Sequence, residues 1–136
     1  MNLDSTLKLR GILPAPVQPQ QWIKFSDLAF AGPKLLGFGP SYSFAGLYAI
    51  MVIDMKWRPL PYRVIYFGEA GNMADRLANH EKRESWKRAA GGSVLFVAVR
   101  AISVESARKA AEERLIGHYS PECNVIHNSL AALLGY

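Results

Sequence analysis

Six side chains of this 136-residue chain have types and spacing that could support acid–base or metal chemistry: Tyr48, Tyr66, Arg76, His80, Glu112 and Asn124. The two tyrosines belong to short signatures at the ends of apolar runs, Gly-Leu-Tyr at 46–48 and Tyr-Phe-Gly at 66–68. Arg76 and His80 are four residues apart, so they share one face of a helix. Phenols, a guanidinium, an imidazole and a carboxylate are the groups that can hold a divalent metal against a phosphodiester and deliver a water to it.

Arg76 and Glu112 suit this chemistry for different reasons. A guanidinium can grip two phosphate oxygens in a fork and balance the charge that develops during hydrolysis. A partly buried carboxylate is costly without a cation, and one carboxylate with phosphate oxygens and waters suits Mg²⁺, or Mn²⁺ in its place. The plainer alternatives are a solvated arginine and an ion pair of Glu112 with Arg108, worth about 0.2–0.5 kcal/mol. Glu113 can pair with Lys109 in the same way.

Each of the other candidates has two interpretations. Tyr48 and Tyr66 lie on neighbouring predicted strands and could converge, although a strand tyrosine is more often a core residue with a satisfied hydroxyl. His80 could bond to the phosphate or donate to the leaving oxygen, or it could be a histidine at a helix end. Asn124 could orient Glu112 or a metal-bound water, or it could be a turn asparagine.

The charge of the chain favours a polyanionic partner, since the formal net charge is +5 and the pI is about 9.5. Basic side chains crowd one short segment, and we expect four of them to contact nucleic-acid phosphates: Lys82, Arg83, Lys87 and Arg88. The alternative is a solvated helix face carrying ion pairs. Charge therefore permits nucleic acid without establishing it.

Composition also indicates the cellular compartment of the protein. The single cysteine, Cys123, cannot form an internal disulfide, which fits a reducing compartment. No run approaches the roughly 20 apolar residues of a membrane span, and the N-terminus lacks a charged leader followed by an apolar block. We therefore expect a cytoplasmic protein with no membrane partner.

Three apolar runs, at 47–53, 64–67 and 94–99, predict three strands buried on both faces. A helical pattern lies between the second and third runs, and another follows the third. The order strand, strand, helix, strand, helix predicts an α/β (α+β) fold. We expect a small three-stranded sheet, antiparallel or mixed, flanked by helices.

The predicted helices have recognisable ends. Asn72 is suited to cap the first helix, whose predicted core positions are Met73, Leu77 and Ala78. The apolar stripe of the second is predicted at Val104, Ala107, Ala111 and Leu115. Ser103 is its expected cap, and the helix should end before Pro121. A last short helix is predicted at 129–134.

The first third of the chain differs from the rest. Short alternating stretches at 7–10 and 22–25 are separated by prolines, and 32–40 is rich in glycine and proline, which predicts a loop. This part has too few apolar residues to fold alone. We therefore expect residues 1–44 to form an extended arm packed on a core domain at 45–136.

These residues resemble the GIY-YIG nuclease superfamily. Its pattern is Gly-Ile-Tyr on one strand, Tyr-Ile-Gly on the next and an arginine on the following helix, and this chain has Gly-Leu-Tyr at 46–48 and Tyr-Phe-Gly at 66–68. Four further positions match in the family's order, with Glu112 in Ala-Glu-Glu-Arg-Leu-Ile and an asparagine after a proline: Arg76, His80, Glu112 and Asn124. The match covers roughly residues 45–127, most of the predicted core.

The resemblance implies a metal-dependent endonuclease that hydrolyses DNA. It implies that Tyr48 assists deprotonation of the attacking water, that Arg76 holds the phosphate and that Glu112 holds the metal ion. The competing reading is a nucleic-acid-binding module with the same fold and no turnover, in which Trp86 stacks on bases. Single-stranded, double-stranded and branched DNA all stay open as substrates, and specificity would come from the arm, from a homodimer or from a partner protein.

Overall fold

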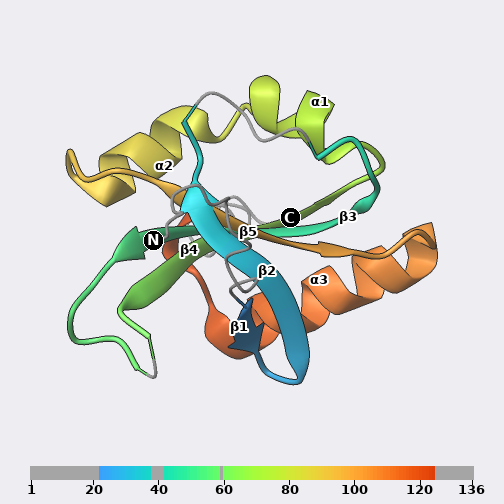
Figure 1. Cartoon of the computed structure of the whole chain (residues 1–136), viewed down its shortest axis with the longest axis horizontal. Coiled ribbons are helices and arrows are strands. Elements are labelled where there is room, and N and C mark those ends of the chain that lie inside the picture. Colours follow the sequence, from blue (N-terminus) through green and yellow to red (C-terminus); the bar gives the residue numbers. More distant parts are fainter. Residues whose placement is uncertain (1–21, 38–41, 59, 125–136) are drawn as a thin grey trace, which may run out of the picture.

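The computed structural model describes residues 22–37, 42–58 and 60–124, so the predicted strand at 7–10 and helix at 129–134 lie outside the described residues. Its centre is a five-stranded antiparallel sheet in the order β1-β2-β5-β3-β4 (Figure 1). The strands are β1 (Trp22–Phe25), β2 (Leu28–Leu35), β3 (Gly46–Ile53), β4 (Tyr62–Ala70) and β5 (Phe96–Ala101). The mixed class of strands and helices agrees with the prediction.

The sheet has two more strands than predicted, because part of the expected arm belongs to it. β1 pairs with β2, and β2 pairs with β5. These two strands contribute three buried core residues: Ile23, Phe25 and Phe30. The predicted loop over 32–40 is wrong for residues 32–35, which continue β2. The register of β2 shifts around Pro33, since proline has no N–H to donate to the ladder.

The central strand β3 is buried on both faces, as its continuous apolar run predicts. All of its residues except Ile53 are buried. Because side chains alternate along a strand, two sets point to opposite faces. One face holds Tyr48, Ile50 and Val52, and the other holds Leu47, Ala49 and Met51. The strand therefore separates two cores, and the site is built on the face that carries Tyr48.

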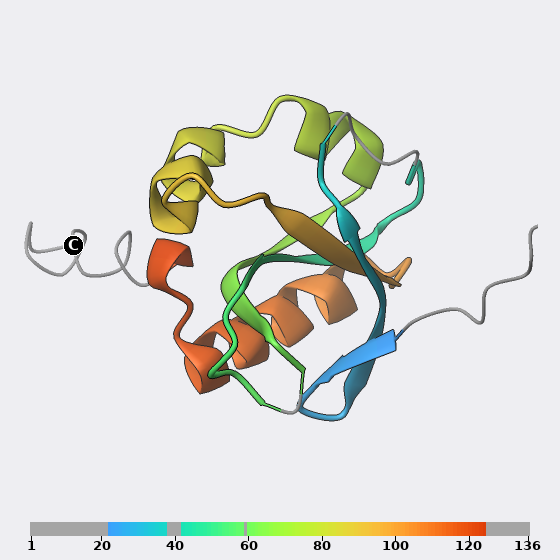
Figure 2. The ribbon, with the colours of Figure 1, turned by 60° about the vertical axis from the view of Figure 1, so that its left-hand side comes forward.

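Each core is covered by helices. Figure 1 shows α1 (Met73–Ala78) and α2 (Arg83–Ala90) on one side of the sheet and α3 (Glu105–Tyr119) on the other, and Figure 2 shows the same layers after rotation. The first two helices bury Met73, Leu77 and Trp86 in the core beside Tyr48. The third helix packs against β4 and buries Ala111 and Leu115 in the opposite core. No helix in the described part of the chain is long and apolar enough to span a membrane.

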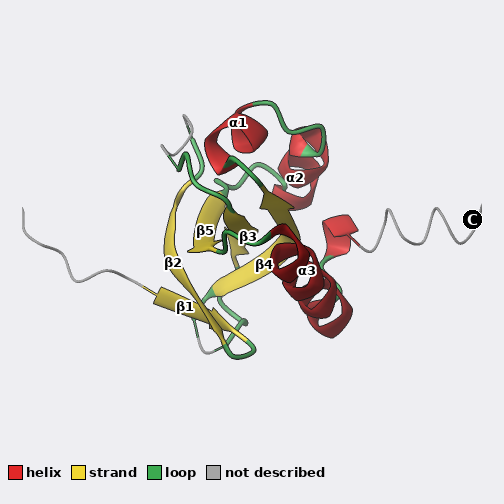
Figure 3. Ribbon diagram, turned by 90° about the vertical axis from the view of Figure 1, so that its right-hand side faces the viewer, coloured by secondary structure: helices red, strands yellow, loops and turns green. Residues whose placement is uncertain are grey.

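The sheet curls around the core on the α3 side (Figure 3). Phe25 on β1 and Phe67 on β4 belong to opposite edge strands, yet their ring centroids are 5.1 Å apart in an edge-to-face arrangement. Phe25 also contacts Tyr119 of α3 at 5.5 Å. Such aromatic pairs contribute about 0.5–1.5 kcal/mol beyond the area they bury. The segment expected as an arm therefore closes one side of the core.

Helix boundaries were only partly predictable. Asn72 caps α1 as predicted, since its side chain accepts from the Asp75 amide at 3.2 Å, but Ala78 is exposed. The predicted first helix is followed by a separate helix, α2. The expected cap at Ser103 is wrong, because Val104 holds that position without a side-chain hydrogen bond. The last helix ends at Tyr119, before Pro121 as predicted, with Ser120 in a left-handed conformation.

The predicted apolar stripe of α3 is also partly wrong. Ala111 and Leu115 are buried, whereas Val104 and Ala107 are exposed. Arg108 is buried on this face instead. A charged residue takes the apolar position because Glu69, an acidic partner on β4, compensates its burial.

Candidate active site

The glycines of the two tyrosine signatures allow the strands to approach. Tyr48 pairs with Gly68 across β3 and β4, and its ring lies over the glycine. A Cβ added at Gly68 would lie 2.7 Å from Tyr48 Cε2 and closer still to Cζ and Oη. A Cβ at Gly46 would lie 3.0 Å from the carbonyl carbon of Arg100 on β5 and closer to its oxygen. Each signature therefore needs glycine for steric reasons.

Tyr48 and His80 form the centre of the site. Tyr48 is 1 % exposed, and its hydroxyl oxygen lies 2.7 Å from His80 Nε2. The backbone N–H of Lys82 donates to His80 Nδ1 at 3.0 Å, so this nitrogen carries no proton. A neutral imidazole with one acceptor nitrogen must carry its proton on the other. His80 therefore donates from Nε2 to the Tyr48 oxygen.

The charge states of this pair follow from burial. Burial and the nearby positive charge of Arg76 lower the pKa of His80 to about 4, so the imidazole is neutral at pH 7. Burial, reinforced by Tyr66 and opposed by Arg76, raises the pKa of Tyr48 above its usual value. Tyr48 is therefore a phenol at neutral pH that accepts from His80 and has its own proton to give.

Tyr66 lies beside this pair, as the sequence predicts. Its ring centroid is 6.2 Å from that of Tyr48 and 5.3 Å from that of His80. Burial, followed by the negative charge of Glu112, raises the pKa of Tyr66 to about 12. The two tyrosines and the histidine thus form one aromatic cluster.

Trp86 packs against His80 and Tyr66 of this cluster. Its side chain is completely buried, and its ring centroid is 4.4 Å from that of His80 and 5.3 Å from that of Tyr66. A side chain in this position cannot stack on a base. The expectation that Trp86 contacts nucleic acid is therefore wrong, and the residue holds His80 in place.

Arg76 lies next to the cluster, but its fork is already engaged. Its Nη1 donates to Glu81 Oε1 at 2.5 Å and its Nη2 donates to Oε2 at 2.8 Å. The guanidinium also lowers the pKa of the Tyr48 hydroxyl and of the His80 imidazole, because it is close to both. Arg76 therefore lies close enough to affect the cluster electrostatically, while the carboxylate of Glu81 occupies its two terminal nitrogens.

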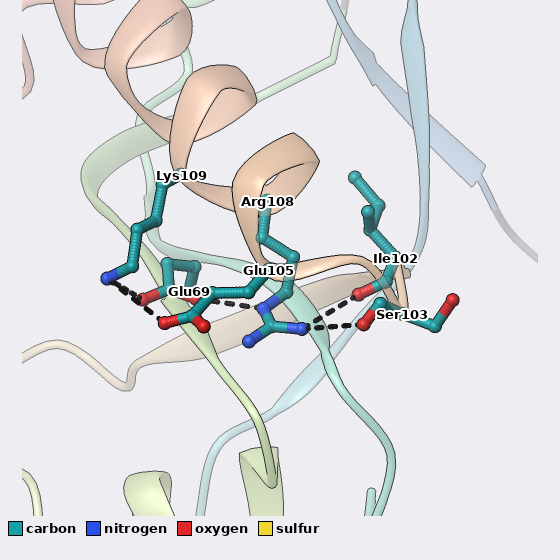
Figure 4. Close-up of polar contacts among 6 residues, drawn as sticks. All are labelled: Glu69, Ile102, Ser103, Glu105, Arg108 and Lys109. Carbon is teal, nitrogen blue, oxygen red and sulfur yellow. Dashed lines mark hydrogen bonds and ion pairs between the residues drawn. The ribbon is translucent and has the colours of Figure 1, made fainter.

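Glu112 is half-buried and does not form the pair considered for it. Arg108 donates from Nε to Glu69 Oε1 at 2.8 Å and from Nη1 to the carbonyl of Ser103 at 3.0 Å (Figure 4). Lys109, the proposed partner of Glu113, pairs with Glu69 at 3.2 Å and with Glu105 at 3.8 Å. Among the described residues Glu112 has no ion-pair partner.

The negative charge of Glu112 affects the pKa values of the two tyrosines in the aromatic cluster. Burial and the negative charge of Glu69 raise its own pKa. Its charge in turn contributes to the raised pKa values of Tyr48 and Tyr66, and Arg76 lowers the pKa of Glu112. The site therefore holds two phenols and a guanidinium close enough to a carboxylate to interact with it electrostatically.

An open groove of about 400 Å³ adjoins the cluster at Arg76. It runs between the end of β4 and the first helix, and its lining residues are Glu69, Ala70, Gly71, Asn72, Asp75, Arg76 and Asn79. Glu112 is outside this lining. The groove gives a ligand access to the guanidinium from solvent.

Asn124 has a structural role that differs from the expected one. Its Oδ1 accepts from the backbone N–H of Phe67 at 2.9 Å, and its Nδ2 donates to the Phe67 carbonyl at 3.1 Å. The side chain thus pairs with the edge strand β4 as another strand would. Both polar atoms of the Asn124 side chain thus bind Phe67 and not Glu112, and they fix the strand between Tyr66 and Gly68.

The predicted nucleic-acid contacts divide into two groups. Arg83 donates to the carbonyl of Leu77 at 2.7 Å and so connects α2 to α1. Lys87 and Arg88 are exposed, and Lys82 is half-exposed. Three of the four predicted side chains therefore remain available at the surface.

The donor set around Glu112 limits which metal could bind. No group of three or more histidine, cysteine, aspartate or glutamate side chains suited to a metal is found among residues 22–37, 42–58 and 60–124. A closed protein cage of the zinc type therefore does not fit these residues. A half-buried carboxylate with no ion-pair partner in the described part of the chain does fit Mg²⁺, which takes most of its ligands from water and phosphate.

Two contacts of the site were not predicted from the sequence. Glu81 binds Arg76, and the Lys82 amide sets the protonation of His80. A glutamate five residues after an arginine is not a recognised pairing pattern, and a backbone amide has no sequence signature.

Comparisons of the chain with protein-family models, with curated proteins and with solved structures found no match.

Proposed function

We propose that this protein is a divalent-metal-dependent endonuclease that hydrolyses DNA phosphodiester bonds through a GIY-YIG-type site. The observation that carries the proposal is the hydrogen bond between Tyr48 and His80, together with the effects of the Arg76 and Glu112 charges on the pKa of Tyr48. Among the described residues Glu112 has no ion-pair partner. A buried structural tyrosine needs a hydrogen-bond partner, which His80 supplies, but it needs neither a cation nor a carboxylate near its hydroxyl.

In this mechanism Arg76 holds two oxygens of the scissile phosphate and balances the charge that develops on them. Tyr48 would first lose its phenol proton to solvent, which the positive charges of Arg76 and of a bound cation would favour, and the phenolate would then accept the proton of the attacking water. The His80 N–H donates to the same oxygen and so stabilises the phenolate. Tyr66, whose ring lies beside both side chains, would share with Tyr48 the handling of the water and its proton.

Glu112 would hold the metal ion, Mg²⁺ or Mn²⁺. The ion, when bound, would polarise the phosphate and lower the pKa of a bound water. The raised pKa of Tyr48 supports the need for such a charge, since Arg76 alone does not offset the effect of burial. Ionisation of Glu112, despite its raised pKa, would also be favoured by the cation.

The test is cleavage of plasmid DNA with Mg²⁺. We expect Arg76→Ala and Glu112→Ala each to reduce the rate by about 100-fold or more, the usual effect of removing a group that stabilises developing charge. The matched controls are Arg114→Ala and Glu113→Ala, which remove exposed charges of the same two signs from α3. Equal activity in all five proteins would indicate a contaminant and would refute the assignment.

The second candidate function is a DNA-binding module with the same fold and no turnover. Exposed basic side chains on α2 favour it, as does a Tyr48 hydroxyl that stays protonated at neutral pH. It predicts salt-dependent DNA binding that survives Glu112→Ala, with no cleavage under Mg²⁺ or Mn²⁺. A panel of single-stranded, double-stranded and branched DNA, with a measurement of oligomeric state, would define the substrate and the need for a dimer or a partner protein.

A further inference from the structure

Glu81 occupies the fork of Arg76 with the geometry that a phosphate would use. Both carboxylate oxygens accept, at 2.5 and 2.8 Å, from the two terminal nitrogens of the guanidinium. Carboxylates and phosphates share this bidentate mode because their oxygens have similar spacing. A phosphate group and Glu81 therefore cannot both bind the edge of the guanidinium formed by Nη1 and Nη2.

We infer that Glu81 is an internal competitor for the phosphate subsite at Arg76 and so sets the affinity of the site for DNA. This inference rests on the proposed function only for the identity of the ligand. The Arg76–Glu81 pair itself is a feature of the fold.

The surroundings of Glu81 allow it to leave without disturbing the cluster. Its side chain is 62 % exposed, whereas Arg76 is 36 % exposed and adjoins the groove. The neighbouring His80 is held independently, by Tyr48 on one ring nitrogen and by the Lys82 amide on the other. Rotation of the Glu81 side chain alone therefore frees the guanidinium, and His80 keeps its position.

The ion pair between Arg76 and Glu81 also persists over the pH range in which binding would be measured. Arg76 lowers the pKa of Glu81 to about 2, so the carboxylate stays charged and competes at any pH at which the protein would be assayed. Acidification to pH 4 does not remove the competitor. Only a ligand that binds the guanidinium better than the carboxylate displaces it.

The experiment measures binding of a fluorescently labelled 20-base-pair DNA duplex in EDTA, so that cleavage does not intervene. The variants are Glu81→Gln and the matched control Glu84→Gln, an exposed glutamate on α2 that pairs with Lys87 at 3.5 Å. We expect Glu81→Gln to tighten the apparent Kd about threefold to fivefold, the range of a partly exposed ion pair. Glu84→Gln, which makes the same change in net charge, should tighten it less than twofold.

The Arg76→Ala background decides whether the effect passes through the guanidinium. There, Glu81→Gln should change the Kd no more than Glu84→Gln does. Equal effects of the two glutamine variants in the parent protein, persistence of the Glu81→Gln effect without Arg76, or absence of DNA binding by Glu81→Gln would each overturn the inference. Unfolding curves of every variant exclude misfolding as the cause.

The two proposals can fail separately. If DNA binding shows coupling between Arg76 and Glu81 but no metal supports cleavage, Glu81 is a competitor for the subsite and the protein is not a nuclease. Cleavage that depends on Arg76 and Glu112, with no such coupling, would retain the nuclease and remove the competitor.

Discussion

Replacement of Gly68 by alanine tests the geometry of the site most directly. The new Cβ would lie 2.7 Å from Tyr48 Cε2 and closer to two other ring atoms, so the ring must move. Tyr48 is 1 % exposed and bonded to His80, so it has no free space to enter. Loss of the ring position should remove the His80 contact as well as the packing.

The expected loss of unfolding free energy is about 2 kcal/mol. Overpacking a core typically costs about 1–3 kcal/mol, and the net loss of a buried hydrogen bond costs about 1 kcal/mol. Against these losses, alanine within a strand stabilises the folded state by about 0.5–1 kcal/mol relative to glycine. Gly71→Ala is the matched control, because its nearest neighbour would be Arg108 Nη2 at 3.9 Å, and we expect a change within about 0.5 kcal/mol.

Urea unfolding followed by far-UV circular dichroism measures both variants, and a double-mutant cycle identifies the cause. In a Tyr48→Val background the ring is absent, so Gly68→Ala should lose most of its effect. An equal loss of stability in both backgrounds would refute the steric argument. So would a Gly68→Ala protein as stable as the Gly71→Ala control.

Three further predictions follow from the charges. The pKa of His80 is lowered from 6.5 to about 4, so the unfolded chain takes up a proton first as the pH falls. Unfolding free energy should therefore drop by up to about 3 kcal/mol between pH 6.5 and pH 4, a dependence that urea titrations of His80→Gln should lack. Arg108→Met leaves Glu69 without its buried partner and should cost about 3 kcal/mol in urea unfolding, whereas Lys109→Met, at an exposed position, should cost less than about 1 kcal/mol; equal losses would contradict this. Glu112→Gln removes a half-buried carboxylate whose pKa is raised, so thermal unfolding should show equal or higher stability. The same variant should have lost cleavage activity. A destabilised variant would argue that Glu112 is structural.

Much of the fold was predictable because it depends on local patterns. The apolar runs of β3, β4 and β5 are continuous, and the Asn72 cap and the stop before Pro121 depend on residues within one turn. The alternating stretch at 22–25 is β1, but its membership of the sheet was not predicted. β2 was missed because glycine and proline interrupt it, and its register shifts at that point. Its membership of the sheet depends on pairing with β5, more than 60 residues away in sequence.

The candidate site was predicted as a set of residues, and its internal contacts were not. The prediction that Arg76 and His80 share one face of a helix is wrong, because α1 ends at Ala78 and His80 follows its C-cap. The charge of Arg76 still acts on His80, and strand pairing placed Tyr48 near Tyr66 as predicted. Helical spacing also suggested an ion pair of Glu112 with Arg108, which the fold replaces by Glu69 from β4. An i,i+4 pair at the surface contributes little, so a better-buried partner on another element wins.

The order of the elements from β3 to α3, apart from the division of one predicted helix into α1 and α2, followed from the sequence, as did the two signature glycines and the set of candidate side chains. Folding was needed to define the partner of each polar group: Glu81 for Arg76, Phe67 for Asn124, and the Lys82 amide for His80. The reason is that periodicity fixes which face a residue occupies, whereas its partner depends on the path of the chain in space. For Asn124 that partner is a strand 57 residues away, and for Arg76 and His80 it is the turn between α1 and α2.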